Sequence, residues 1–163
     1  MSIEQNKAIV RRFYTEVVGK GDLSRIEVFI APDYVDHAAG PEAGRGPAVM
    51  RAHLQALRQT FPDFTLQIED IIAEDDRVVT RVSGRGTHRG EWQRINPTEA
   101  VIHVRGINID RVVDGRIVEH WVEADTMDML CQMGVDPLAG RLGAQRGGNK
   151  LRRRKSGKAK RRR

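Results

Sequence analysis

The sequence predicts an α+β fold in which a curved antiparallel sheet carries helices on one side and encloses a pocket. Apolar residues recur every three or four positions in the first third of the chain, and they alternate with polar residues in most of the second half. Helices that precede a run of antiparallel strands pack together on one side of the sheet. Long strands interrupted by glycine curl, so we expect a conical, barrel-like interior closed by the helices.

Length and charge predict one folded domain followed by a basic tail. The chain has 163 residues, enough to bury a core without disulfides. Its net charge of +6 is local, because 11 of the 28 Lys and Arg residues lie in residues 146–163, which contain no acid. We expect a domain over residues 1–140 and a disordered tail over residues 141–163. The tail either binds nucleic acid or other polyanions non-specifically or is only a solvated extension.

The first third of the chain is predicted to form three helices. Ser2 and Gln5 make a capping box at the start of the first helix. The second helix, over residues 23–30, is short. The third, over residues 47–61, begins at Pro47, whose fixed φ suits the first helical turn. A short extended piece, Tyr34-Val35-Asp36-His37, and a loop rich in Gly and Pro, from Ala38 to Pro47, separate the second helix from the third.

Four strands and a short last helix are predicted to follow. The period changes from 3.6 to 2 after Pro62. Three glycines between residues 83 and 90 suggest a bulge or a sharp bend, and Asp114-Gly115 is typical of a two-residue hairpin turn. The predicted strands run from 64 to 72, from 78 to 82, from 100 to 113 and from 116 to 124, and the helix spans 126–133.

The Asp-Gly turn makes His120 a candidate catalytic residue. A two-residue loop pairs Val113 with Arg116, and a regular ladder from there pairs Ile109 with His120. His120 then stands among aliphatic residues on the more apolar face of the hairpin, and Asp110 lies on the opposite face. Burial and nearby carboxylates tune the pKa of such a group for general acid/base work. The alternative is a core histidine bonded to the backbone.

Asp125 is the second candidate catalytic residue. It lies between the last strand and the last helix, so it suits either the helix N-cap or a proton acceptor at the rim of the pocket. Strict alternation puts Asp125 and His120 on opposite faces. The two side chains meet only if the strand bulges or ends before Asp125.

Several classes of function are disfavoured. The single cysteine, Cys131, excludes an internal disulfide and a cysteine-cluster zinc site. The histidines lack metal-ligand spacing, and no dinucleotide fingerprint or nucleophile elbow is present. No apolar run is long enough to span a membrane, and the N-terminus does not resemble a signal peptide. We therefore expect a cytoplasmic protein without metal or membrane contact.

An ordered set of short motifs carries a family resemblance. The chain resembles the SnoaL-like polyketide cyclase and ester cyclase family, within the nuclear-transport-factor-2-like superfamily of conical α+β folds. The matching segments include Tyr34-Val35-Asp36-His37, Phe61-Pro62-Asp63-Phe64, Gly86-Thr87-His88-Arg89-Gly90-Glu91 and Gly115-Arg116-Ile117-Val118-Glu119-His120-Trp121, followed by Asp125.

This resemblance implies a function and a set of site residues. It implies a homodimer and cofactor-free acid/base chemistry on a small apolar or aromatic carbonyl compound, such as ring closure by aldol condensation. Asp125 matches the acid/base aspartate of characterised cyclases of this family, and His120 assists. The expected substrate-binding residues are His37, His88, Trp92, Trp121 and Arg105. A non-catalytic binding protein of the same fold is the alternative.

Overall fold

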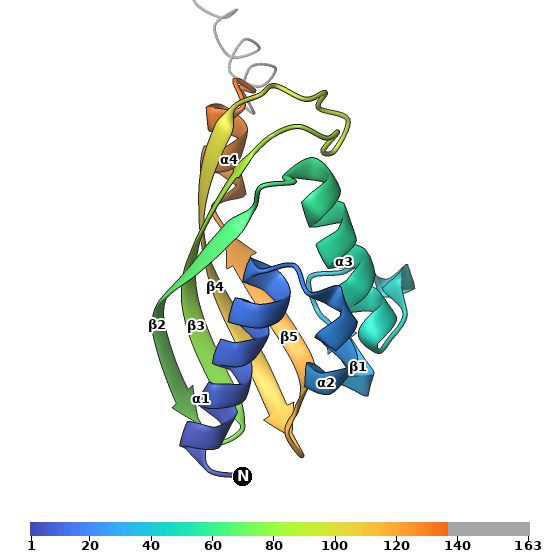
Figure 1. Cartoon of the computed structure of the whole chain (residues 1–163), viewed down its shortest axis with the longest axis vertical. Helices are drawn as coiled ribbons and strands as arrows, with labels where there is room; N and C mark the ends of the chain where they lie inside the picture. The colour runs from blue at the N-terminus through green and yellow to red at the C-terminus, as the bar shows by residue number, and fades with distance from the viewer. Residues whose placement is uncertain (137–163) are drawn as a thin grey trace, which may run out of the picture.

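The computed structural model describes residues 1–136, so the predicted tail at residues 141–163 lies outside the described residues. Figure 1 shows the elements in chain order. The helices are α1 (Ile3–Arg12), α2 (Ile26–Phe29), α3 (Pro47–Thr60) and α4 (Thr126–Gln132), with short 3₁₀ or π segments η1 (Phe13–Gly19), η2 (Leu23–Arg25) and η3 (Pro41–Ala43). The strands are β1 (Ile30–Asp36), β2 (Thr65–Glu74), β3 (Arg77–Thr87), β4 (Val101–Val113) and β5 (Arg116–Ala124).

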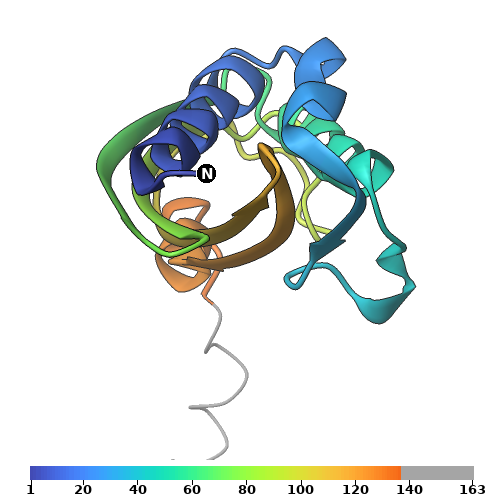
Figure 2. The same cartoon turned by 90° about the horizontal axis from the view of Figure 1, so that it is seen from below.

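The five strands form one curved, unclosed sheet in the order β1-β5-β4-β3-β2. All neighbours are antiparallel except β1, which runs parallel to β5. Figure 2 shows α1, α2 and α3 on the concave side, whereas α4 packs against β4 on the other side. The predicted α+β class, with a curved sheet and helices over one face, is confirmed.

The first helix begins as predicted and ends in an unexpected way. Ser2 and Gln5 form the capping box. Beyond Arg12 the chain continues as the π-helical segment η1, whose last carbonyl groups need partners. The Arg58 guanidinium on α3 supplies them, donating to the carbonyl oxygens of Val18 and Gly19 at 2.7 Å each. It also donates to the Phe64 carbonyl at 2.6 Å, which ties the start of β2 to both helices.

The core lies between the concave face of the sheet and the helices. Its largest fully buried side chains include Tyr34, Phe13 and Phe29. The glycines of β3 serve packing rather than the predicted bend: a Cβ on Gly84 would lie 2.6 Å from the ring of Phe64. The pairing of β3 with β2 and β4 is regular at these glycines, so the predicted bulge is absent there, and the register shift lies between Ile68 and Asp70 of β2. The glycines therefore make room for aromatic rings inside the cone.

A β-bulge changes the predicted register of the last hairpin. The pairs next to the turn form as expected, but Val118 is an extra residue, and Asp110 rather than Ile109 pairs with His120. The predicted pairing of His120 with Ile109 is therefore wrong. One extra residue turns every following side chain to the other face. The bulge thus places His120 on the same inner face as Asp110, while Ile109 and Trp121 form a pair on the outer face.

Candidate active site inside the cone

A largely apolar cavity of about 160 Å³ lies between the concave face of the sheet, η1 and α3. An engineered apolar cavity of about 150 Å³ holds one benzene molecule, so this space suits a single ring or a chain of similar bulk. Four polar side chains interrupt the apolar lining. They are Tyr14 from η1, His53 from α3, Asn108 from β4 and His120 from β5.

His120 forms a buried pair with Asp110. Its Nδ1 lies 2.9 Å from Oδ1 of Asp110, whose side chain is fully buried. The other oxygen, Oδ2, accepts a hydrogen bond from the Tyr14 hydroxyl at 3.0 Å. Because Nδ1 is engaged by Asp110, Nε2 is the ring nitrogen of His120 that remains for a ligand.

The surroundings of this pair favour a protonated His120. Burial by itself lowers the pKa of His120, but the hydrogen bond and charge of Asp110, together with the charge of Asp36, raise the pKa above its ordinary value. Burial, the charge of Asp110 and the hydrogen bond to Asp110 raise the pKa of Tyr14 well above its ordinary value. Tyr14 therefore stays a hydrogen-bond donor to the carboxylate.

His53, which lines the same cavity, also lies beside a buried aspartate. The Asp36 side chain, at the end of β1, is only 1% exposed. Its Oδ1 accepts a hydrogen bond from the amide of Ala38 at 2.9 Å. Its Oδ2 has no hydrogen-bond partner among the described residues and lies 3.9 Å from Nδ1 of His53. The side chain of His53 is half-exposed at the mouth of the cavity.

The cavity also holds an unsatisfied amide. Asn108 is buried, and its Nδ2 has no hydrogen-bond partner in residues 1–136. Buried polar atoms are nearly always paired in folded proteins, so an unpaired donor in a cavity wall is available to a ligand or to water. Asn108 and His120 come from neighbouring strands and line the same hollow.

Asp125 lies outside this cavity. Its Oδ1 accepts a hydrogen bond from the amide of Asp128 at 3.1 Å, which caps α4. Its Oδ2 accepts a hydrogen bond from Arg105 at 3.0 Å, and the Arg105 side chain is exposed on the surface. The structure therefore gives the Asp125 carboxylate two partners, and neither Asp125 nor Arg105 is among the residues that line the cavity.

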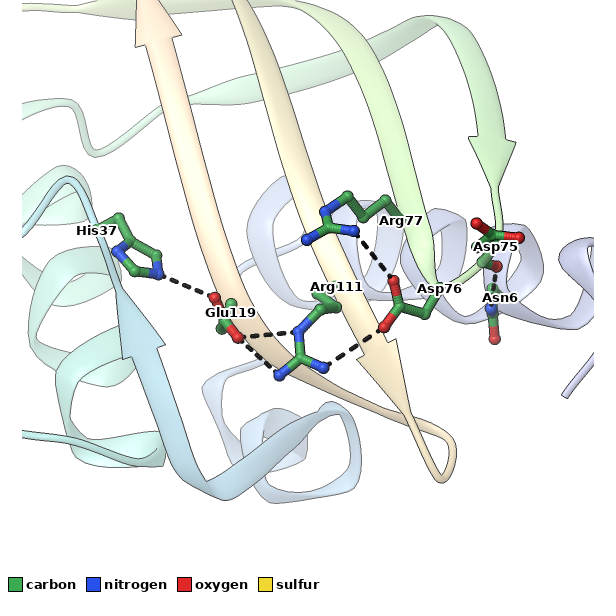
Figure 3. A network of polar contacts seen from close by, with 7 residues as sticks. All are labelled: Asn6, His37, Asp75, Asp76, Arg77, Arg111 and Glu119. Carbon is green, nitrogen blue, oxygen red and sulfur yellow. Dashed lines mark hydrogen bonds and ion pairs between the residues drawn. The ribbon is translucent and has the colours of Figure 1, made fainter.

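His37 and Trp121 also lie away from the cavity, on the outer face of the sheet. Their rings stack with centroids 4.3 Å apart. Figure 3 shows His37 at one end of a polar network across the strands. Nε2 of His37 lies 3.1 Å from Glu119, and Glu119 in turn binds Arg111. These predicted substrate-binding residues are thus held together. The amide of His37 donates to the carbonyl oxygen of His120 at 2.9 Å, but neither His37 nor Trp121 lines the cavity with the His120 ring.

His88 and Trp92 lie near the loop between β3 and β4. His88 is fully buried, with Nδ1 3.0 Å from the Thr98 hydroxyl, and does not line the cavity. Trp92 lines a second hollow beside α3, which shares His53 and Leu57 with the main cavity. Of the predicted substrate-binding residues, Trp92 therefore lines this second hollow, and Arg105 lines another one, which shares Leu66 with the main cavity.

Sequence reasoning missed Asp110 and His53 as site residues. The regular ladder assumed for the last hairpin placed Asp110 opposite the face of His120, and only the bulge brings them together. A signal for His53 was present, because it lies three residues after Met50 and one before Leu54, on the apolar stripe of its helix. A polar residue on such a stripe faces the interior.

Three further findings concern metal sites, membrane-spanning helices and the cysteine. Residues 1–136 contain no cluster of three His, Cys, Asp or Glu side chains that could hold a metal ion. Among the same residues, no helix has the length and apolar character needed to cross a membrane. Cys131 is exposed and unbridged.

The conical fold and its internal cavity define a class of small α+β proteins, and comparison with known proteins identifies the family within it. The family model described as SnoaL-like polyketide cyclase matches residues 8–133. The chain therefore belongs to the SnoaL-like polyketide cyclase family. No curated protein matches the chain.

Solved structures show the same fold. IdmH from Streptomyces antibioticus, provisionally assigned as a polyketide cyclase, is 36% identical with a TM-score of 0.70, over 80% of this chain and 99% of its own. AclR from Streptomyces galilaeus, provisionally assigned as a hydroxylase, is 28% identical with a TM-score of 0.69, over 82% of this chain and 98% of its own. TsrD from Streptomyces laurentii is 24% identical with a TM-score of 0.76, over 83% of this chain and 99% of its own. Because these assignments differ, the fold alone does not determine the reaction.

Proposed function

We propose that this protein is an enzyme that moves a proton at the carbon next to a carbonyl group, without a cofactor. The substrate is a small apolar or aromatic carbonyl compound, and ring closure by aldol condensation is the overall reaction. The observation that carries this proposal is His120, bound to the buried Asp110, in the wall of a largely apolar cavity. Membership of the polyketide cyclase family supports the same reaction class.

The geometry supplies the stabilisation that an enolate needs. Protonated His120 donates from Nδ1 to Asp110, which leaves the Nε2 proton for the carbonyl oxygen of the substrate. The Nδ2 group of Asn108 is a second donor in the same wall. Donors that are already positioned where negative charge develops lower the barrier most effectively in a site from which water is excluded. The carbonyl oxygen therefore gains charge against His120 and Asn108 as the C–H bond breaks.

Ring closure then needs no further reagent. The enolate carbon attacks a second carbonyl carbon of the same molecule and forms the new C–C bond. The electron pair of that carbonyl moves to its oxygen, which takes up a proton in place of the one removed from the carbon and becomes a hydroxyl group. The cavity holds about one ring, so we expect it to enclose the part of the substrate that reacts.

Deuterium exchange tests this function. Phenylacetone is a one-ring ketone whose benzylic protons exchange through the enolate, and proton NMR in heavy water follows their loss. We expect the native protein to accelerate exchange and His120→Gln to reduce the rate by roughly 10²–10³-fold, the usual effect of removing one oxyanion donor. His103→Gln is the matched control, because His103 is exposed on β4 and does not line the cavity.

Other results would point elsewhere. Exchange no faster than in buffer contradicts the proposed activity, and saturable binding of phenylacetone without exchange favours a non-catalytic binding protein. Exchange that survives His120→Gln unchanged removes His120 from the mechanism. Asp125→Asn is a further arm, because the acid/base role of Asp125 stays a prediction, and its position outside the cavity favours an unchanged rate.

A further inference from the structure

Two histidines line one cavity from different walls, each beside a buried aspartate, and the mechanism above uses only one of these pairs. His120 lies on β5, and His53 lies on α3. We infer that His53 is the base that removes the substrate proton, with its ring oriented by the buried carboxylate of Asp36. This inference rests on the proposed function and assigns a residue to the proton-removal step.

The position of His53 suits a base. It lines both the main cavity and the second hollow, so it stands where the two spaces meet. Its Nδ1 is the nitrogen nearest to Asp36, at 3.9 Å from Oδ2. That oxygen is buried and otherwise unpartnered among the described residues, and a buried carboxylate oxygen gains from a nearby N–H group. A proton on Nδ1 leaves the lone pair on Nε2, the form in which imidazole accepts a proton.

The environments of the two histidines favour opposite protonation states. Partial burial of the His53 ring, with a further contribution from the charge of His120, lowers the pKa of His53, and the charge of Asp36 only partly opposes this effect. The pKa of His120 is raised, as described above. Two groups in one site whose pKa values are moved apart are suited to the separate roles of base and acid. Between the two pKa values, His53 is neutral while His120 is protonated.

The other polar groups in the cavity wall do not suit the role of a base. The Tyr14 hydroxyl donates its proton to Asp110, and both Asp110 oxygens are occupied by Tyr14 and His120. The Asn108 amide does not act as a base. Of the described polar side chains that line the cavity, His53 is therefore the one suited to accept a proton.

The proton-removal step balances with these groups alone. The C–H bond next to the carbonyl breaks, and its proton goes to Nε2 of His53. The bonding pair forms the C=C bond of the enolate, and the carbonyl π pair moves to the oxygen, which His120 and Asn108 hold. In heavy water, the half-exposed His53 exchanges its proton with solvent and returns a deuteron to the carbon.

The experiment compares exchange and binding of phenylacetone in the full chain. We expect His53→Gln to lower the exchange rate by roughly 10²–10⁴-fold, the usual contribution of a general base, and to leave Kd within about threefold. His120→Gln should lose exchange and also weaken binding, because it removes a donor to the carbonyl oxygen. Imidazole in solution should restore exchange to His53→Ala, because the mouth of the cavity is open. His103→Gln again serves as the control.

The outcomes separate this inference from the function on which it rests. No exchange by the native protein overturns the proposed function, and His53 then has no such role. Exchange by the native protein and equally by His53→Gln overturns only the assignment of His53. Loss of exchange in His53→Gln with equal loss of binding, and no rescue of His53→Ala by imidazole, makes His53 a binding residue and also overturns it.

Discussion

Asp110 is the residue on which the protonation state of the site depends. Its fully buried carboxylate has two partners, Tyr14 and His120, and both come from elements that line the cavity. A buried charge without a partner is strongly unfavourable. Removing one member of this group therefore leaves another member buried without its partner. The same contacts that stabilise the fold at this point also raise the pKa of His120.

Replacing Asp110 with Asn should destabilise the protein by about 3 kcal/mol, and the loss should depend on pH. The folded pKa of His120 is raised, so the stabilisation from its protonation is fully present below the unfolded pKa of about 6.5. It is lost as the pH rises through the folded pKa. Urea unfolding should therefore show a larger deficit for Asp110→Asn at about pH 6 than at about pH 9.

Asp33→Asn provides the matched control for this change, since Asp33 is exposed on β1. Its effect on the free energy of unfolding should be small at both pH values. A deficit in Asp110→Asn that is equal at both pH values would contradict the coupling between Asp110 and the protonation of His120.

At the scale of elements, Arg58 joins three segments that build the cavity wall. Its guanidinium donates to carbonyl groups at the end of η1 and at the start of β2, while its own backbone belongs to α3. Without it, the last carbonyl groups of η1 would lack these charge-assisted hydrogen bonds. The π-helical segment that carries Tyr14 therefore depends on an arginine from another helix.

We expect Arg58→Met to lower the free energy of unfolding by roughly 2–4 kcal/mol, because several charge-assisted hydrogen bonds are lost at once. Arg58→Lys should recover less than half of the loss, since an ammonium group lacks the planar fork. Arg85→Met, at an exposed position of β3, is the control in the same urea titrations. Equal stability of Arg58→Met and the native chain would show that water replaces these contacts without loss.

For the whole molecule, the outer face of the sheet carries an apolar row. Ile72, Val79, Ile109 and Trp121 are in register across β2, β3, β4 and β5, and Ile72 is 65% exposed. The network in Figure 3 borders the row with both signs of charge. We propose that a second copy of the chain covers this row, because a two-fold pairing buries the apolar residues and lets opposite charges meet.

A single charge should disrupt this homodimer. We expect Ile109→Glu to be monomeric by sedimentation velocity at protein concentrations of tens of micromolar, where the native chain is dimeric, because the buried carboxylate would lack a partner. Val28→Glu, at an exposed site on α2, should stay dimeric. A monomeric native chain contradicts the proposed interface. Polyanion binding by residues 141–163 and a cytoplasmic location remain predictions.

The sequence by itself determined the order of elements and much of their detail. The capping box at Ser2, the helix start at Pro47 and the Asp-Gly turn are local patterns whose chemistry acts within a few residues, so they were predictable without tertiary information. The α+β class followed from the change of period. His120 was also identified, although the neighbours predicted for it were wrong.

The tertiary structure decided which side chains meet. The extra residue Val118 turns His120 inward to Asp110, and no local rule announces a bulge at that point. His53 and Asp36 are brought together from a helix and a distant strand end. The Asp125 carboxylate binds Arg105 and caps α4. Local sequence encodes backbone shape through nearest-neighbour sterics and hydrogen bonds. Contacts between distant segments depend on packing and register, which are settled only when the whole sheet forms.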